Sequence, residues 1–383
     1  MLNYLMRREV FFSFLLQLVL ALFLAHGYDF RVNYLAGRNV VLGLSPYEGG
    51  YLEGLLAIGY GQYVQGLGET PLWALYAGLA YLVSAGNLFL FNLILKIPII
   101  TANIALSFLA MKRGGDHYFF LYNPFTLLVS AVWGKPDNVA VLLAVISITM
   151  LHRFCGPLSG AVSVMIKPLA LSMTPSFIVA WWKEKKKMFI AFGASVLMFF
   201  TPFVLLGWRL GTVIYGFPNW FRSAGGISPF NFVEAVYGTS TMPSWLEPIS
   251  YVSVVSLMVM VILAIKLLPT GSEGVFRLGL VSASLFFSLR PWVSEQNLLI
   301  ILSLFIIVCG KLPSRLLWII PLVFAGLNLS IPQQLYLLYP SIIHGLAALN
   351  HPIRYWLKFV VSVIWIIALW AILVKKCPWR WWI

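Results

Sequence analysis

Charged residues are scarce in this chain, and their scarcity excludes most soluble proteins. Only 10% of the 383 residues are Asp, Glu, Lys or Arg, while 61% are hydrophobic; a soluble domain has about 25% charged residues. So little charge cannot cover the surface of one or more soluble cores. A soluble enzyme and a disordered chain are therefore excluded. The composition predicts an all-α protein with many membrane-spanning helices.

Cysteines and recognisable catalytic motifs are also few. The three cysteines, Cys155, Cys309 and Cys377, form neither a C-x-x-C pair nor a His/Cys spacing, so a disulfide scaffold, a redox pair and a zinc site are not supported. A Walker motif, a G-x-G-x-x-G after a strand and an H-E-x-x-H are likewise absent from the sequence. No cofactor is expected, and a divalent metal is not indicated.

Acidic residues number only 12 against 26 basic ones, which gives a net charge of +14. In a soluble protein this excess would suggest a nucleic-acid partner. Here no aromatic and basic stretch resembles an RNA-binding or DNA-binding module, so nucleic acid is not expected. The excess instead predicts that lysine and arginine gather on the cytoplasmic side of a membrane.

Apolar stretches recur along the whole chain. They cover residues 10–25, 71–84, 88–111, 118–132, 138–151, 157–166, 168–181, 188–208, 248–268, 276–289, 296–310, 316–328 and 358–374. Several are shorter than the roughly 20 residues that a perpendicular spanning helix needs, so these are expected to be tilted or broken. Irregular backbone at membrane depth must line a cavity or lie inside protein, and broken spans therefore point to an internal site.

The segment 71–84 determines the predicted topology. If this segment lies at the outer interface and the N-terminus is inside, the chain has about twelve spans. The inner side then carries sixteen basic and four acidic residues, and the outer side nine basic and eight acidic residues. The positive-inside rule selects this arrangement. It leaves a long first outer loop over 26–87 with interfacial helices, further outer loops over 209–247 and 329–357, and both termini in the cytoplasm.

Asp29 follows the first apolar stretch, in the sequence HGYDFRVNY. A carboxylate at that boundary is suited to accept a proton from a substrate hydroxyl. The structural alternative is an interfacial anchor paired with Arg31 or Arg38. The residue alone leaves these two interpretations evenly matched.

Two candidate phosphate-binding cations stand at interruptions of apolar stretches. Lys167 precedes Pro168, which breaks a helix, and Arg290 opens the polar cluster RPWVSEQN. An ammonium or a guanidinium placed there is suited to a phosphate. The alternatives are snorkelling of Lys167 to the headgroups and simple pairing of Arg290 with Glu295.

Other polar residues fall inside or beside the apolar stretches. Lys96 and Asn103 are seven residues apart and so face the same side of one helix, and charges at membrane depth are functional hypotheses by default. Asn123 begins a short stretch that ends in WGKPDN. There, Asp137 can take part in a site or simply cap the helix 138–151.

Taken together, these blocks resemble the GT-C superfamily of multi-spanning glycosyltransferases. They are most similar to the catalytic subunit of GPI mannosyltransferase I and its prokaryotic relatives. The resemblance covers residues 1 to about 310 and is carried, in order, by Asp29, Ser45-Pro46-Tyr47, Thr70-Pro71-Leu72, Lys96, Asn103, Asn123-Pro124, Ser130, Gly134, Asp137, Lys167-Pro168 and Ser228-Pro229-Phe230.

The chain departs from the family pattern at two acidic positions. The eukaryotic relatives carry D-x-D, whereas this chain reads Gly27-Tyr28-Asp29, and Asn103 stands where the relatives have Asp. A mechanism that needs both carboxylates does not transfer unchanged. The resemblance implies a GT-C-like catalytic module over 1–310, followed by C-terminal spanning helices and a basic cytoplasmic tail over 311–383.

The resemblance implies transfer of a hexose, expected to be mannose, from a polyprenyl (dolichyl) phosphate to a hydroxyl of a lipid-linked or protein-linked acceptor, with inversion. Asp29 would be the general base. Arg290 and Lys167 would bind the donor phosphate, supported by Lys135 and Arg222. The sugar or acceptor would be bound by residues from several segments: Asp137, Glu295, Asn123, Lys96, Asn103 and Tyr47.

The expected location is a plasma membrane in a prokaryote or the endoplasmic reticulum in a eukaryote, with the site on the outer or lumenal face. Membrane lipids are expected partners, together with a small membrane subunit. The main competing hypothesis is a transporter or lipid flippase, which also explains an intramembrane Lys96 and broken helices. It predicts internal repeats, which the sequence does not show. A non-catalytic assembly subunit, which would tolerate loss of Asp29, is a third alternative.

Overall fold

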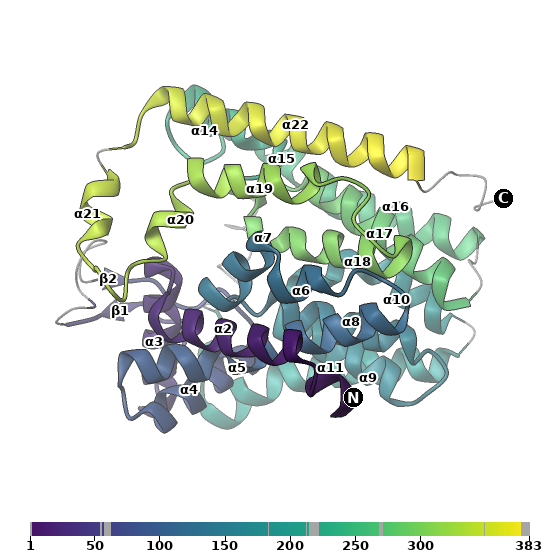
Figure 1. Cartoon of the computed structure of the whole chain (residues 1–383), viewed down its shortest axis with the longest axis horizontal. Helices are drawn as coiled ribbons and strands as arrows, with labels where there is room; N and C mark the ends of the chain where they lie inside the picture. Colours follow the sequence, from purple (N-terminus) through teal and green to yellow (C-terminus); the bar gives the residue numbers. More distant parts are fainter. Residues whose placement is uncertain are drawn as a thin grey trace.

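The computed structural model is predominantly helical, with only two small pairs of strands. It describes residues 2–53, 56, 63–182, 184–211, 213, 222–267, 271–347 and 349–376. The predicted basic tail beyond Lys376 lies outside the described residues. Many of the long helices run roughly parallel to one another, and α22 and α19 lie side by side along one edge (Figure 1).

The first half of the chain forms the helices around the first predicted outer loop and the interrupted stretches after it. Its elements are α1 Leu2–Leu5, α2 Arg8–Phe23, α3 Gly27–Val41, β1 Gly50–Tyr51, β2 Tyr63–Val64, α4 Pro71–Ser84, α5 Leu88–Lys112, α6 Tyr118–Tyr122, α7 Pro124–Leu127, the π-helix η2 Leu128–Val132, α8 Asp137–Thr149, α9 Cys155–Ile166, the 3₁₀-helix η3 Pro168–Met173 and α10 Thr174–Trp181. β1 and β2 pair in antiparallel fashion.

The second half adds long apolar helices and a second, parallel strand pair, β3–β4. Its elements are α11 Lys185–Leu206, β3 Gly225–Gly226, the 3₁₀-helix η4 Pro229–Asn231, α14 Phe232–Tyr237, α15 Glu247–Ser250, α16 Val252–Leu267, α17 Gly271–Leu289, β4 Trp292–Val293, the 3₁₀-helix η5 Glu295–Leu298, α18 Leu299–Cys309, α19 Leu316–Leu327, α20 Ser330–Gln333, α21 Ile342–Ala347 and α22 Pro352–Lys376.

The peripheral helices expose their apolar side chains, the reverse of a soluble protein. Along α11, Phe189, Phe192 and Val204 are each about two-thirds exposed or more. Only 17% of the most apolar 18-residue stretch of α11 is buried inside the protein, against 67% of the corresponding stretch of α17. Exposed apolar surface of this extent marks a face for lipid. The long helices therefore indicate a membrane-embedded protein.

By length and composition, five described helices are able to cross a membrane: α5, α11, α15 with α16, α17 and α22. A sixth results if the bent pair 124–132 and 137–149 is one broken span. Five shorter apolar helices, 71–84, 155–166, 168–181, 295–309 and 316–327, accompany them. The structure therefore shows five or six long apolar helices with shorter ones beside them. The predicted count of about twelve spans stays a prediction.

Two helix interruptions expected from the sequence are confirmed. The helices on either side of residues 133–136 meet at 107°, and α9 ends at Ile166, directly before Lys167-Pro168. Proline at the start of η3 explains the second interruption, because its ring and missing N–H do not fit a helix interior. Both interruptions carry candidate site residues.

The helix that carries Asp29, α3, packs closely on α4. A Cβ atom built on Gly37 would lie 2.5 Å from the carbonyl oxygen of Ala77, and one on Gly78 would lie 2.5 Å from Cγ1 of Val40. Only glycine permits this approach of the two backbones. The contact fixes α3 against the segment that follows Glu69 and Thr70.

The predicted site and Lys187 lie at opposite ends of α8. Asp137 is the first residue of α8. At the other end, Nζ of Lys187 donates to the carbonyl of Leu151 at 3.2 Å, just beyond the end of α8. In Figure 1 the β1–β2 hairpin, α3, α20 and α21 likewise gather at one end of the molecule, on the left.

The α3–α4 contact makes a test of packing. We expect Gly37→Ala to lower the melting temperature of the detergent-solubilised protein, because the rigid carbonyl of Ala77 blocks the new methyl group, an overpacking cost of about 1–3 kcal/mol. Gly193→Ala in α11 is the matched control, since nothing lies within 4 Å of the new Cβ. Equal melting temperatures for the two variants, measured by differential scanning fluorimetry, would contradict the close contact.

Candidate functional site

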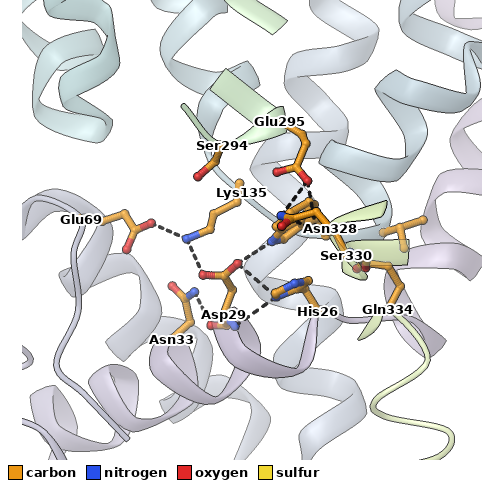
Figure 2. Close-up of polar contacts among 12 residues, drawn as sticks. His26, Asp29, Asn33, Glu69, Lys135, Ser294, Glu295, Asn328, Ser330 and Gln334 are labelled. Carbon is orange, nitrogen blue, oxygen red and sulfur yellow. Dashed lines mark hydrogen bonds and ion pairs between the residues drawn. The ribbon is translucent and has the colours of Figure 1, made fainter. Parts of the chain in front are cut away.

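Asp29 lies in the first turn of α3, where it is held by three side chains. Its Oδ1 is 2.7 Å from Nζ of Lys135, its Oδ2 is 3.2 Å from Nδ1 of His26, and Oδ2 also accepts a hydrogen bond from Nε1 of Trp133 (Figure 2). The predicted alternative of an anchor paired with Arg31 or Arg38 is wrong in its partner: the carboxylate pairs with Lys135, from a segment more than 100 residues away.

The bend after η2 supplies two of these three partners. Residues 133–136 connect η2 to α8, so Trp133 and Lys135 both extend from the interruption toward the start of α3. The indole of Trp133 also stacks on His26, with ring centroids 4.4 Å apart and an angle of 13°. The broken helix thus places an indole, an ammonium and a carboxylate together, as expected for irregular backbone that serves a site.

A chain of ion pairs continues from Lys135. Oε1 of Glu69 lies 2.8 Å from Nζ of Lys135 and 3.1 Å from Nζ of Lys167, and Nζ of Lys167 lies 3.6 Å from Oδ2 of Asp137. Each of the five side chains, including Asp29, is at most 14% exposed. The structure therefore joins the predicted residues Asp29, Lys135, Lys167 and Asp137 through Glu69.

Two motifs of the first predicted outer loop hold Glu69 in this position. The amide of Leu67 donates to the carbonyl of Pro46 at 3.0 Å. The hydroxyl of Thr70, the residue before α4, donates to the carbonyl of Met165 in the last turn of α9. Met165 lies two residues before Lys167, so the Thr70 contact brings Glu69 to that lysine.

Asp137 is completely buried and does not cap α8. Its Oδ1 accepts a hydrogen bond of 2.9 Å from Nδ2 of Asn297, and no side-chain capping bond begins α8. The predicted capping role is therefore wrong. The guanidinium of Arg290 lies 5.7 Å from the ring centroid of Phe286. Burial lowers the pKa of Arg290 to about 10, and the negative charge of Asp137 partly offsets this effect.

Glu295 forms a second buried cluster next to this network. Its Oε1 accepts hydrogen bonds of 3.0 Å from Nδ2 of Asn328 and from Oγ of Ser330, and Nε2 of Gln334 donates to the carbonyl of Ser330 (Figure 2). The expected pairing of Glu295 with Arg290 is thus replaced by neutral donors. The amide of Ala25 donates to the carbonyl of Gln334 at 2.8 Å, which joins the cluster to the chain just before His26.

Three predicted site residues lie away from the ion-pair chain. Asn123 caps α7, since its Oδ1 accepts from the amides of Phe125 and Thr126, and it stands at the far end of α7 and η2 from Trp133. Asn103 is fully buried in the middle of α5, and its side chain forms hydrogen bonds with Gln17, Ser130 and Asn138. Arg222 is 56% exposed and pairs with Glu247 at 3.5 Å. Their assignment to one site with Asp29 is corrected.

Tyr47 and Lys96 have mixed outcomes. The ring of Tyr47 stacks on Phe203 with a centroid distance of 5.6 Å, and its buried hydroxyl makes no hydrogen bond among the described residues. Burial, and then the negative charge of Glu69, raises the pKa of Tyr47, so it borders the network. Lys96 is buried as expected, but its Nζ donates to the main-chain carbonyls of Leu24 and Val132.

The charges of the network compensate for its burial. Burial by itself raises the pKa of a carboxyl group, yet the ammonium of Lys135 and the ring of His26 bring the pKa of Asp29 far below its usual range. For Glu69, burial is likewise outweighed, here by Lys135 and Lys167, and its pKa falls to about 2. Both acids are therefore ionised at neutral pH.

Sequence reasoning missed Glu69, His26, Trp133 and the cluster of Asn328, Ser330 and Gln334. Glu69 carries a usable signal, because it directly precedes the Thr70-Pro71-Leu72 block. The residues at 328–334 carry none, since this part of the chain matches no motif of the resembled family. Among the described residues, no group of three or more His, Cys, Asp and Glu is arranged to hold a metal ion.

Comparison with known proteins adds no relative: models of protein families and the curated proteins searched give no match to this sequence. The GT-C resemblance therefore stays a prediction that rests on the order of its motifs.

The shifted pKa of Glu69 predicts acid sensitivity. A depressed pKa stabilises the folded state above the unfolded pKa, near 4.5, and this stabilisation is lost as pH falls toward about 2. We expect the melting temperature to fall between pH 5 and pH 3, and to fall less in Glu69→Gln, which has no charge to lose there. An identical pH dependence for both proteins in thermal unfolding would contradict the ion pairs of Glu69.

Proposed function

We propose that this protein is a membrane glycosyltransferase that moves a hexose from a polyprenyl phosphate donor to an acceptor hydroxyl, with inversion. The observation that carries the proposal is the buried chain Asp29–Lys135–Glu69–Lys167–Asp137. It combines a carboxylate for a proton with two ammonium groups for a phosphate. In this proposal Arg290 adds a third cation.

In the proposed reaction the acceptor oxygen attacks the anomeric carbon while Asp29 takes its proton. The bond between that carbon and the phosphate oxygen breaks, and polyprenyl phosphate leaves. General-base help of this kind contributes roughly 10²–10⁴-fold. The leaving phosphate gains negative charge, which Lys135, Lys167 and Arg290 stabilise, and fixed cations in a water-poor site are well suited to this task.

In this proposal the carboxylate of Glu69 occupies the position that the donor phosphate would take. Its single oxygen Oε1 lies between the ammonium groups of Lys135 and Lys167, where a phosphate oxygen fits equally well. A bound phosphate would draw Lys135 away from Asp29 and so raise the low pKa of Asp29 toward that of a better base. Donor binding and base strength are coupled through one lysine.

The proposed orientation follows from the charges at the two ends of α8. Lys187 lies at one end, and Asp137 with the network lies at the other. The positive-inside rule then assigns the network to the outer or lumenal face of a multi-pass protein with about twelve full or partial spans. The polyprenyl tail of the donor would lie among the exposed apolar helices. The proposed sugar is mannose, and the proposed acceptor is lipid-linked or protein-linked.

A transporter or flippase is the second hypothesis. It is favoured by the 107° bend between 124–132 and 137–149, since discontinuous helices form substrate sites in transporters. The ion-pair chain joins residues at the ends of helices: Asp29 at the start of α3, Asp137 at the start of α8 and Lys167 after α9. Both hypotheses allow this position. The carboxylate of Asp29, linked to two ammonium groups that suit a phosphate, favours the enzyme.

The proposed function is tested by sugar transfer with purified protein, polyprenyl-phosphate-mannose and lipid acceptors. We expect Asp29→Asn to lower kcat by roughly 10²–10⁴-fold, because an amide still accepts the hydrogen bond of Trp133 but takes no proton. Lys187→Gln, at the opposite end of α8, is the matched control and keeps its activity. Equal turnover by Asp29→Asn would overturn the base assignment, and movement of intact donor across vesicles without transfer would favour the flippase.

The role of Glu69 gives a separate binding test. We expect Glu69→Gln to bind a short-chain polyprenyl phosphate more tightly than the wild type, because the competing negative charge between the two lysines is gone. Isothermal titration calorimetry in detergent measures the dissociation constant, and Glu184→Gln at the far end of α8 is the control. Weaker binding by Glu69→Gln would show that this carboxylate contacts the ligand and does not compete with it for the two lysines.

A further inference from the structure

Lys96 is a buried lysine whose amino group forms hydrogen bonds with the main chain. It extends from α5, is 1% exposed, and its Nζ donates to the carbonyl of Leu24 at 2.5 Å and to the carbonyl of Val132 at 2.7 Å. Leu24 is the cap residue at the end of α2, and Val132 is the last residue of η2. Carbonyls at helix ends lack intrahelical partners and carry partial negative charge, so one amino group caps two helix ends.

The two segments that Lys96 joins are the ones that carry the Asp29 site. His26 and Asp29 follow Leu24, while Trp133 and Lys135 follow Val132. Across the gap between these segments, Asp29 bonds both Trp133 and Lys135. Any change in the separation of the two main chains therefore changes the contacts of the carboxylate directly.

Gly134 shows how closely the bend packs on Lys96. Its φ of +85° is one that glycine adopts readily, and a Cβ built on it would lie 2.5 Å from Cε of Lys96 and 3.2 Å from Cγ. The aliphatic part of Lys96 thus packs against the bend, while its amino group donates a hydrogen bond to the carbonyl of Val132, just before the bend.

We infer that Lys96 is a positioning residue, which sets the geometry of Asp29 relative to Trp133 and Lys135 by tying the end of α2 to the end of η2. This replaces the sequence-based expectation that Lys96 contacts sugar or acceptor. The catalytic consequence rests on the proposed function, whereas the structural link between the two segments does not.

Asn92 offers a matched control from the same helix. Its Nδ2 donates to the carbonyls of Ala21 and Leu24, so it caps the end of α2 as Lys96 does. Neither of these hydrogen bonds reaches Val132 or the bend. Asn92→Leu therefore removes the support of one segment, and Lys96→Met removes the link between both.

The kinetic test compares these variants in the sugar-transfer assay. We expect Lys96→Met to lower kcat by roughly 10²-fold with a donor KM close to that of the wild type, since a misplacement of about 1 Å has that effect on rate. Asn92→Leu keeps kcat near the wild-type value. Gly134→Ala, which displaces the Lys96 side chain, reproduces the kcat defect if Lys96→Met does not fold. A defect confined to the KM of donor or acceptor would overturn the inference in favour of substrate contact.

Hydrogen exchange provides a readout that does not need activity. With Lys96→Met we expect faster amide exchange in both 25–31 and 132–138, and with Asn92→Leu only in the first segment. Unchanged exchange in 132–138 of Lys96→Met would overturn the link. If the wild type transfers no sugar, the proposed function fails, and the exchange pattern alone then supports or rejects the role of Lys96.

Discussion

The ammonium group of Lys135, held between the carboxylates of Asp29 and Glu69, is the interaction on which the rest of this structure depends. The two acids come from different segments, one at the start of α3 and one before α4, and the lysine comes from the bend before α8. Buried charges are tolerated only when they are paired with good geometry. These three segments therefore have to meet, and the helices around them are arranged accordingly.

The interruptions of the helices provide the means of meeting. A continuous helix through 124–149 would carry Lys135 past the site, and a continuous helix through 155–181 would do the same for Lys167. The 107° bend and the Lys167-Pro168 break instead turn both ammonium groups toward Glu69. The helix ends at these two interruptions thus place polar side chains in the network.

The charges of the network largely compensate one another. Three acids and two lysines contact each other at 2.7–3.6 Å, so in the proposed reaction a substrate phosphate would displace the carboxylate of Glu69 from the lysines. Such an arrangement favours ligands that bring as much negative charge as they replace. In the proposed reaction the low pKa of Asp29 would rise only when a phosphate draws Lys135 away from it.

The sequence by itself determined the class of protein, because low charge and recurring apolar stretches permit little besides a membrane-embedded helical chain. It also located both helix interruptions, because proline and glycine act locally, and it selected Asp29, Lys135, Lys167 and Asp137 as polar residues at the ends of apolar stretches. Only the tertiary structure decided which of them pair. Two of the three partners of Asp29, Trp133 and Lys135, lie more than 100 residues away. Asn123 caps its own helix, Asn103 bonds side chains of other helices, and the donors to Glu295 come from a region without any motif. A buried charged side chain needs a partner of opposite charge or a hydrogen bond. Which partner it finds depends on how segments distant in the sequence pack together, and no local stretch of residues determines that packing.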